Sequence, residues 1–350
     1  MVTTRICILS PLKPASGNYS TASRIRLYFP HEEGDHHLLM RDPKTFSNDK
    51  VFKDFLREKN VHLIIALHAF HCSYLLKDCS LPFIVIFGGT DLNLNRLNPA
   101  DSLCMYPIVK RARYLVCFST EMRNNALNQW SELFREKMLV IPQGAKVFPS
   151  LYPFRSHIHK ILLRKESTRL RIFTLVAGIR RVKDPLFLLD TFAAWHNFNP
   201  HVYLVVIGPI LEEKLGKQFK SEVESCEGVI YYGQLSTEDT HAAIEQSDAL
   251  INSSLSEGMS TAILEALALG VPVIARDIPG NSAIIKHGEN GLLFKTTEDF
   301  VQQAERLIAS NQLKEQLIKN GLAYVGENHS CEEEREAYRS LVESVIDNNL

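Results

Sequence analysis

The feature that most constrains the fold is a regular alternation of apolar runs with helix-length segments along the whole chain. Most of these runs are continuous stretches of Val, Ile, Leu and Phe, which is typical of parallel strands covered by helices on both faces. Strands and helices at this spacing predict two successive doubly wound α/β units. The predicted strands are 5–10, 37–41, 61–67, 83–87, 113–118 and 138–141 in the first half, and 170–177, 202–207, 229–232, 249–252, 271–275 and 291–294 in the second.

The length of the chain also indicates more than one domain. A chain of 350 residues is too long for one ordinary core and suits two domains of moderate size. Prolines near residue 150, followed by a basic and polar stretch, predict a linker between them. An amphipathic pattern that starts with acidic residues predicts a final helix. We place the N-terminal domain at 1–150, the linker at 151–168, the C-terminal domain at 169–330 and the final helix at 331–350.

Composition excludes several classes of protein. The formal net charge is −1, so no overall basic field points to nucleic acid. The apolar run at 6–9 is shorter than the apolar region of a signal peptide, and no later run approaches transmembrane length. The seven cysteines are odd in number and scattered, as expected of reduced thiols. We therefore expect a cytoplasmic protein with no transmembrane segment.

The ends of the predicted strands supply candidate site residues. In open parallel sheets, ligands bind beyond the carboxyl ends of the strands. In the first half these ends lead into loops at 16–20, which holds Gly17, at 68–72, which begins with His68, and at 88–91. Two domains whose strand ends face one another would place such loops around one cleft.

Residues 252–281 are the most informative stretch of the second half. They contain two glutamates, Glu257 and Glu265. Residues 256–258 favour the start of a helix, and Gly270 favours its end. Free N–H groups and the helix dipole at such a start favour a phosphate or diphosphate. We place Glu265 two turns inside, roughly 12 Å from Glu257 at about 1.5 Å of rise per residue. A nucleotide sugar, with a hydroxyl-bearing ring on each side of a diphosphate, would fill this arrangement.

A basic turn follows the first strand of the second half. Arg180 and Lys183 would neutralise a diphosphate leaving group, by bidentate contact and as a point charge respectively. Arg180 is preferred to Arg181 because its spacing to Lys183 places both on one side of a turn. A solvated basic turn is the alternative. For Glu265, which needs a partner if it is buried, a structural salt bridge is the alternative to a sugar hydroxyl.

Two histidines bracket the end of a very apolar strand in the first half. His68 and His71 are either site residues or satisfied histidines of the core or a loop. With Cys72 and Cys79 they suggest a metal site, but no second close pair completes a tetrahedral set, so we expect no metal ligands. Gly17 is weak evidence by itself, because no G-x-G-x-x-G fingerprint follows the first strand.

Taken together, these residues resemble the retaining glycosyltransferases of family 4. The strongest match is the run EGMSTAILEA, which is similar to the E-x7-E segment of that family. The resemblance covers roughly 140–325 closely and the first half more loosely. The matching segments are 141–144, 178–183, 252–254, 257–266, 270–275, 279–281 and 290–293.

The resemblance implies a GT-B fold, with two Rossmann-like domains whose parallel sheets face a central cleft. It implies that Glu257 contacts the donor hexose and Glu265 the ribose. The family usually needs no metal or other cofactor, and its final helix crosses back to the first domain. The residues implied to bind the diphosphate through backbone N–H groups are Gly258, Met259, Ser260 and Thr261.

The same resemblance assigns the remaining candidates. Arg180 and Lys183 would stabilise the departing phosphate, and Gly17 would approach the diphosphate from the first domain. Many family members carry a histidine immediately before the Gly-Thr-Asp-like turn, where this chain has Gly88. His68, one strand earlier, is the candidate to take the place of that histidine.

We therefore expect a hexosyltransferase that uses a nucleoside-diphosphate sugar, in first place a UDP-sugar, and retains the anomeric configuration. The acceptor is left open. One alternative, motivated by Gly88, is a nucleotide-sugar-binding protein with little or no transferase activity. Another keeps the fold but catalyses sugar-nucleotide epimerisation, and no residue favours it.

Overall fold

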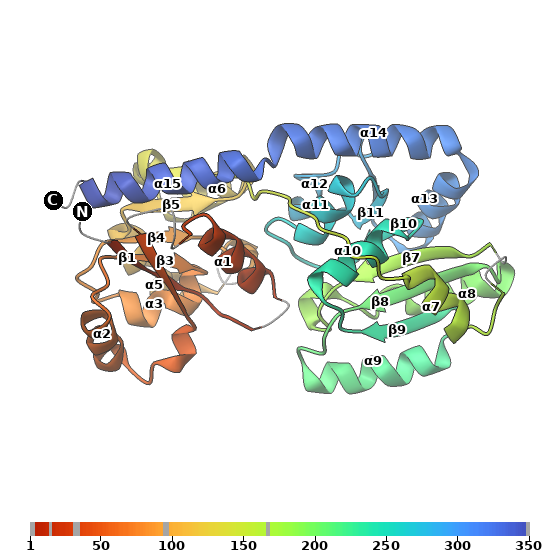
Figure 1. Cartoon of the computed structure of the whole chain (residues 1–350), viewed down its shortest axis with the longest axis horizontal. Coiled ribbons are helices and arrows are strands. Elements are labelled where there is room, and N and C mark those ends of the chain that lie inside the picture. Colours follow the sequence, from red (N-terminus) through yellow and green to blue (C-terminus); the bar gives the residue numbers. More distant parts are fainter. Residues whose placement is uncertain (1–3, 14–15, 31–35, 94–97, 166–168, 348–350) are drawn as a thin grey trace. The chain divides into compact units, whose positions relative to one another are not determined.

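Two α/β units make up the chain, and each is built on one parallel sheet (Figure 1). The computed structural model describes residues 4–13, 16–30, 36–93, 98–165 and 169–347. The first unit comprises Met1–Gly144 and Cys331–Leu350, and the second comprises Ala145–Ser330.

The first unit has a six-stranded sheet in the order β2-β1-β3-β4-β5-β6 within the described residues, and all of its strand pairs are parallel. Its strands are β1 (Thr4–Leu9), β2 (His36–Arg41), β3 (Leu63–Leu67), β4 (Phe83–Ile86), β5 (Tyr114–Cys117) and β6 (Met138–Val140). Its helices are α1 (Gly17–Leu27), η1 (Pro43–Thr45), α2 (Asp49–Glu58), α3 (Ala69–Leu76), α4 (Gly89–Asn93), α5 (Pro99–Arg111), α6 (Thr120–Trp130), η3 (Glu132–Lys137) and α15 (Cys331–Asp347).

The second unit also has a six-stranded parallel sheet, in the order β12-β11-β10-β7-β8-β9 for the residues described. Its strands are β7 (Arg171–Val176), β8 (Val202–Ile207), β9 (Val229–Gly233), β10 (Ala249–Asn252), β11 (Val273–Arg276) and β12 (Leu292–Phe294). Its helices are α7 (Phe154–Ile161), η4 (Arg181–Lys183), α8 (Leu189–Phe198), α9 (Glu213–Ser225), α10 (Thr237–Glu245), α11 (Thr261–Ala268), α12 (Pro279–Ser282), α13 (Thr297–Ala309) and α14 (Asn311–Asn328).

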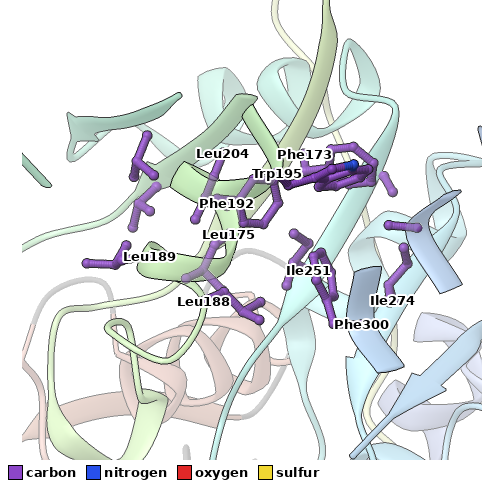
Figure 2. Packing of buried hydrophobic residues seen from close by; sticks show 14 of the residues in the cluster. Phe173, Leu175, Leu188, Leu189, Phe192, Trp195, Leu204, Ile251, Ile274 and Phe300 are labelled. Atoms are coloured by element: carbon purple, nitrogen blue, oxygen red, sulfur yellow. The ribbon is translucent and has the colours of Figure 1, made fainter. Parts of the chain in front are cut away.

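Every predicted strand run overlaps a strand of the structure, and the predicted α/β fold is confirmed. The runs are continuously apolar because alternate side chains face different helical layers. In β8, Val202, Leu204 and Val206 belong to one buried cluster, whereas Tyr203 and its alternate neighbours belong to another. Figure 2 shows the first cluster, in which side chains of β7 and β8 pack against Phe192 and Trp195 of α8 and Phe300 of α13.

Strand order places one special position in each sheet. From β7 the second unit adds β8 and β9 on one side, and then returns to add β10 on the other side of β7. The crevice between β7 and β10 is therefore the topological switch point, where ligands of open α/β sheets bind. In the first unit the corresponding reversal lies between β1 and β3.

Residues 151–168 are not the linker that the sequence predicts. The helix α7 forms inside this range, and its Phe154 and Ile158 are fully buried against the second sheet. These two side chains are four positions apart and so lie on one face of the helix. The other face is basic and polar, which is why the stretch looks like a linker in the sequence. The N-terminal segment of the first unit also ends at Gly144 rather than at residue 150.

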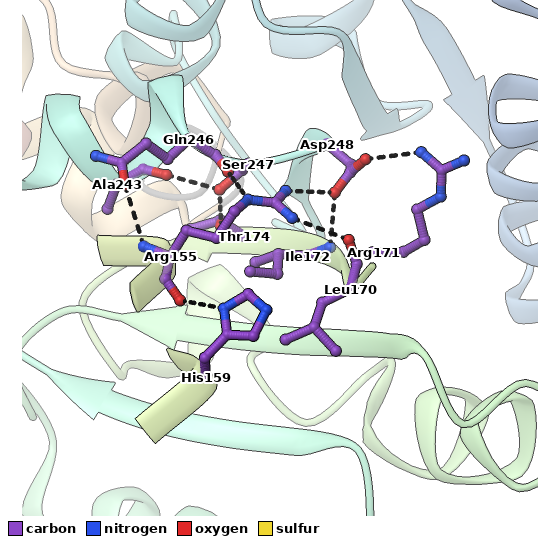
Figure 3. Close-up of polar contacts among 10 residues, drawn as sticks. All are labelled: Arg155, His159, Leu170, Arg171, Ile172, Thr174, Ala243, Gln246, Ser247 and Asp248. Atoms are coloured by element: carbon purple, nitrogen blue, oxygen red, sulfur yellow. Dashed lines mark hydrogen bonds and ion pairs between the residues drawn. The ribbon is translucent and has the colours of Figure 1, made fainter. Parts of the chain in front are cut away.

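A largely buried carboxylate, Asp248, ties α7 to the amino ends of β7 and β10 (Figure 3). Arg155 approaches Asp248 Oδ2 at 2.9 Å and Arg171 approaches Oδ1 at 3.0 Å, while the Ile172 N–H donates to Oδ2 at 2.9 Å. Burial alone would raise the pKa of Asp248, but the Ile172 N–H and the two guanidinium groups outweigh burial and lower it. The carboxylate is thus ionised at neutral pH and satisfied.

The C-terminal helix α15 belongs to the first unit. Its Glu334 accepts hydrogen bonds from Arg24 Nε and from the Gly144 N–H, each at 2.8 Å. Within the described ranges, every helix falls short of the length or apolarity that a membrane crossing needs. The residues of α15 buried in the core of the unit are Tyr338, Leu341, Val342 and Val345.

Candidate functional site

An ion pair lies at the switch point of the second unit. Lys183 is in the turn η4 after β7, and Glu257 is in the loop after β10. Lys183 Nζ lies 2.5 Å from Glu257 Oε1, and the two side chains are only 18% and 10% exposed. The same oxygen accepts from Ser254 Oγ at 2.7 Å and from Asn252 Nδ2 at 3.3 Å. The sequence-predicted residues of two separate motifs are therefore in direct contact.

The environment of Glu257 keeps it charged. Burial opposes ionisation and would raise its pKa, but the charge and hydrogen bond of Lys183, together with Ser254 and Asn252, outweigh burial and lower the pKa. Glu257 is therefore a carboxylate at neutral pH. It is an acceptor of hydrogen bonds only, and as such is suited to bind hydroxyl groups.

The turn that begins α12 packs closely against the loop that carries Glu257. A Cβ at Gly280 would lie 2.1 Å from the carbonyl oxygen of Glu257, so only glycine allows the two backbones to approach this closely. Next to it, Asn281 Nδ2 donates to Asn252 Oδ1 at 3.1 Å and to Arg276 O at 3.0 Å. These contacts join the Pro-Gly-Asn segment to the segment that carries Glu257.

The helix after Glu257 begins later than the sequence predicts. Its first residue is Thr261 and its N-cap is Ser260, so residues 256–258 lie in the preceding loop. The predicted spacing of roughly 12 Å between the glutamates loses its basis, because it assumed a continuous helix at about 1.5 Å per residue. Ser260 Oγ accepts from Asn252 Nδ2 at 3.0 Å and does not cap its own helix. The predicted end is right, since Gly270 follows the C-cap with a φ of +67°.

Several buried polar atoms in the segments that carry or support the ion pair have no hydrogen-bond partner among the described residues. They include Arg180 Nε, Ser256 Oγ and Asn281 Oδ1. Buried polar groups are normally paired, so unpaired ones at the carboxyl edge of a parallel sheet indicate a ligand site. Arg181 differs, because its side chain is 85% exposed and lies 4.0 Å from Glu212. The two adjacent arginines therefore have different surroundings.

Glu265 lies in the second turn of α11, on the same edge of the second unit. Its side chain is 25% exposed. The ring of His241 lies beside it, with His241 Nε2 3.6 Å from Glu265 Oε1. Sequence reasoning did not single out His241, which no local motif marks. The carboxylate thus has one oxygen near a buried ring and part of its surface open.

A further set of contacts, which sequence reasoning also missed, holds the backbone of Lys183. Asp184 has a φ of +45°, a backbone conformation that residues other than glycine rarely adopt. Arg276 binds Asp184 Oδ2 at 2.8 Å, and Ser253 Oγ donates to the carbonyl oxygens of Lys183 and Asp184 at 3.0 and 3.1 Å. These contacts fix the direction in which Lys183 points.

The first unit carries a separate cluster at the carboxyl ends of β3 and β4. His68 is 4% exposed, with Nδ1 2.7 Å from Asp91 Oδ1 and Nε2 bonded to Thr90 Oγ1. Burial would raise the pKa of Asp91, but His68 and the N–H groups of Phe70 and Gly88 lower it. Because Asp91 is charged, the proton of the ring belongs on Nδ1, and the Thr90 hydroxyl donates to Nε2. Sequence reasoning placed Thr90 and Asp91 in a turn but gave them no role.

Gly88 is in contact with the His68 ring. A Cβ at Gly88 would lie 2.8 Å from His68 Cδ2, so the ring fills the space where a side chain at position 88 would start. The ring of His71 lies 4.3 Å from that of His68, and burial lowers the pKa of His71 to about 4. Among the described residues, no group of three or more His, Cys, Asp or Glu side chains is arranged to hold a metal ion.

Gly17 is the first residue of α1 and is exposed. A Cβ at this position would meet no other described atom within 4 Å, so packing does not explain the glycine. Residues 14–15, which precede it, lie outside the described residues.

Comparison with known proteins agrees with this geometry. The family model for glycosyl transferases group 1 matches residues 159–323. The chain is 39% identical over 340 residues to glycosyltransferase 1 domain-containing protein 1 of Xenopus tropicalis, and the match covers 97% of each chain. It is also 26% identical over 181 residues to the UDP-Gal:alpha-D-GlcNAc-diphosphoundecaprenol alpha-1,3-galactosyltransferase of Escherichia coli, over 49% of this chain and 46% of that enzyme.

Solved structures share the architecture. Anabaena Alr3699/HepE in complex with UDP and glucose has a TM-score of 0.80 at 14% identity, covering 97% of this chain and 100% of that one. Sucrose-phosphate synthase from Thermosynechococcus elongatus has a TM-score of 0.78 at 15% identity, covering 99% of this chain and 100% of that one. The two Rossmann-like units are those of the GT-B fold. The chain therefore belongs to the group 1 family of glycosyl transferases, and it is a transferase.

Proposed function

We propose that this transferase moves a hexosyl group from a nucleoside-diphosphate sugar, and from a UDP-sugar in particular, as the retaining enzymes of family 4 do. The observation that carries the proposal is the Lys183–Glu257 pair at the switch point, beside the buried and unpaired Arg180 Nε. Similar proteins support the choice of donor, since HepE has been solved with UDP-glucose and the E. coli relative uses UDP-Gal.

The positive charges near the switch point would receive the diphosphate. Lys183 contributes an ammonium and Arg180 a guanidinium, which suit phosphate oxygens as a point charge and a fork respectively. The N-terminus of α11 adds backbone N–H groups that the side chain of its N-cap, Ser260, leaves uncapped. The residues proposed to present these N–H groups are Gly258, Met259, Ser260 and Thr261. Charge arranged in advance at the leaving group is the largest contribution that such a site makes to rate.

The two glutamates would bind the sugars on either side of the diphosphate. Glu257, which is ionised and acts only as an acceptor, would bind hydroxyls of the donor hexose. Glu265, which is one-quarter exposed on α11, would bind those of the ribose. Gly17 would let the backbone at the start of α1 approach the diphosphate, which accounts for a glycine that packing does not require.

His68 would take the part of the histidine that family 4 has immediately before its Gly-Thr-Asp-like turn. The observation in favour is that the His68 ring fills the space of a side chain at Gly88. Because His68 is buried and bonded to Thr90, its effect on a substrate would be passed on by the Thr90 hydroxyl.

No resident cofactor is needed in this proposal, because Lys183 and Arg180 supply the positive charge that a metal ion supplies in other transferases. Equal transfer rates before and after treatment with EDTA would support this point, and a loss restored by Mg²⁺ or Mn²⁺ would overturn it.

We also propose that the chain acts in the cytoplasm. Five of its seven cysteines are buried as free thiols, which suits a reducing compartment. A fluorescent fusion of the full chain tests this, and a signal confined to secretory organelles would contradict it.

The function is tested by transfer and hydrolysis assays with a panel of UDP-, GDP- and ADP-sugars. Wild type is compared with Lys183→Ala and Glu257→Ala, and the anomeric configuration of the product is read by NMR. The proposal expects turnover with retained configuration in wild type and a loss of about 10²- to 10³-fold in either variant. Inverted product would refute retention, and equal activity in all three proteins would refute the site.

A second candidate function is nucleotide-sugar binding with little or no transfer, and Gly88 is the observation that favours it. Binding of a UDP-sugar with no turnover against a broad pool of acceptors would select this candidate. Thermal shift detects the binding itself, because a ligand at 100 times its Kd stabilises the folded chain by about 2.7 kcal/mol.

A further inference from the structure

His241 is a buried histidine of α10 that none of the site motifs contains. It is 2% exposed, and its Nδ1 accepts the backbone N–H of Phe148 at 3.1 Å. A ring nitrogen that accepts a hydrogen bond carries no proton, so the proton of the neutral ring is on Nε2. The contact with Phe148 therefore selects one tautomer of His241.

The residues next to Phe148 hold it against α10. Ser150 Oγ donates to Asp239 Oδ1 at 2.6 Å, and the Ser150 N–H donates to Glu238 O at 3.1 Å. The N–H that selects the tautomer is thus kept in place by the start of the same helix that carries His241. The ring has one fixed acceptor side and one fixed donor side.

The donor side faces Glu265. Nε2 is buried and has no hydrogen-bond partner among the described residues, and Glu265 Oε1 lies 3.6 Å away. This distance is just beyond a normal N–H···O bond, which spans about 2.7–3.2 Å. An unsatisfied buried donor is unfavourable, so a small movement of the carboxylate toward the ring is favoured as soon as another group holds it there.

We propose that His241 is a positioning residue that orients Glu265 toward the ribose hydroxyls of a nucleoside diphosphate. One carboxylate oxygen accepts from His241 Nε2 while the other remains available for the ribose, because each oxygen has its own lone pairs. The inference rests on the proposed function and deepens it, because it assigns recognition of the ribose to a pair of residues. His241 itself touches no ligand.

Two substitutions separate the donor role from packing. His241→Gln places an amide N–H near the position of Nε2 and keeps the donor toward Glu265. His241→Asn is shorter, so it keeps an acceptor for the Phe148 N–H but presents no donor to Glu265. The matched pair differs by one methylene group, and thermal unfolding of both shows whether each is folded.

The probes are UDP and 2′,3′-dideoxy-UDP, which lacks both ribose hydroxyls, and their affinities are measured by calorimetry on the full chain. If the panel of sugars identifies another base, the corresponding pair of nucleotides is used. We expect wild type to bind UDP about tenfold or more tightly than the dideoxy compound, as for loss of hydrogen bonds to a charged group. His241→Asn should reduce this ratio about three- to tenfold with the affinity for dideoxy-UDP unchanged, and His241→Gln should restore it.

The outcomes distinguish this inference from the function on which it rests. If wild type binds UDP much more tightly than dideoxy-UDP and His241→Asn leaves this ratio of affinities unchanged, the role of His241 is overturned, while the proposed function stands. Equal weakening of both nucleotides in His241→Asn also overturns it, since that is the mark of a structural defect. Failure of wild type to bind any nucleoside diphosphate overturns the proposed function and the role of His241 together.

Discussion

Two acids in the second unit occupy opposite edges of one sheet and invite comparison. Asp248 precedes β10 at the amino edge, and Glu257 follows β10 at the carboxyl edge. Both are largely buried, both contact cations, and in both the partners outweigh burial and lower the pKa of the carboxyl group. Chemically the two clusters use the same kinds of group.

The clusters differ in what surrounds the ion pairs. None of the side chains drawn in Figure 3 around Asp248 has a buried polar atom without a partner. Around Glu257, by contrast, Arg180 Nε, Ser256 Oγ and Asn281 Oδ1 have no partner among the described residues. A satisfied buried network stabilises a fold, whereas one with unpaired donors and acceptors is completed by a ligand. The comparison therefore separates a structural cluster from a binding site within one domain.

The largest expected effect concerns Arg180. Arg180→Met should lower kcat/KM about 10²- to 10³-fold, which is about 2.7–4 kcal/mol of transition-state stabilisation. The free energy of unfolding should stay the same or rise, because the guanidinium makes no hydrogen bond or ion pair with the described residues. Steady-state kinetics and urea unfolding measure the two quantities.

Arg181→Met is the matched control for this prediction. Arg181 is adjacent in sequence, but its side chain is 85% exposed. Both kcat/KM and the free energy of unfolding should therefore stay close to the wild-type values. If Arg180→Met unfolds more easily and keeps full activity, the contrast between the two clusters is lost.

The second prediction concerns the structural cluster. Asp248→Ala should lower the free energy of unfolding by about 3 kcal/mol, because it leaves two guanidinium groups and the Ile172 N–H without their shared partner. The affinity of the folded variant for UDP should be unchanged. Urea unfolding gives the first value and calorimetry the second. A loss of stability below about 1 kcal/mol would contradict the structural assignment.

The third prediction concerns Gly280, whose close packing against the Glu257 loop positions the carboxylate. Gly280→Ala inserts a methyl group 2.1 Å from the carbonyl oxygen of Glu257, so the loop that carries the carboxylate must move. Overpacking of this kind costs about 2 kcal/mol of stability, and the displaced carboxylate should weaken donor binding as well. Gly326→Ala lies in the last turn of α14, where a Cβ meets no atom within 4 Å, and serves as the control: it should leave donor affinity unchanged and keep or raise stability, because alanine is favoured over glycine in a helix. Wild-type donor affinity in Gly280→Ala would show that the position of the loop is not critical.

The strands were predictable because their signal is local and redundant. In β8 each side chain faces one helical layer or the other, so every position is apolar and the run stands out. The rule for strand ends also placed Lys183 and Glu257 at the same edge of the second sheet, although the direct ion pair between them was not predicted.

What the sequence did not predict depends on single contacts between distant residues. The helix α7 looks like a linker because Phe154 and Ile158 are its only buried apolar residues. The start of α11 was misplaced because Ser256 and Ser260 are both of a residue type that favours an N-cap, and in the structure Ser260 holds that position while its Oγ accepts from Asn252. His241 has no local signature at all, since its role depends on a distant N–H and a distant carboxylate.

The smallest expected effect is the response to acid. The folded-state pKa of Asp248 is lowered, so its contribution to stability is fully present above the ordinary aspartate pKa of about 3.9 and is lost as pH falls through the lower folded value. Wild type should therefore lose stability below about pH 4, while Asp248→Asn should lose less over the same range. Thermal unfolding between neutral pH and about pH 3 measures the difference. Parallel curves for the two proteins would show that Asp248 does not titrate differently in the folded chain.

The account is tested most directly by calorimetric titration of the full chain with UDP-sugars and UDP, using wild type, Arg180→Met and Arg181→Met. We predict saturable binding at one site in wild type, the same affinity in Arg181→Met, and an affinity at least about tenfold weaker in Arg180→Met, which loses a charge-assisted contact to phosphate. Equal affinities in the two variants would contradict the claim that the unpaired groups around Glu257 form the donor site.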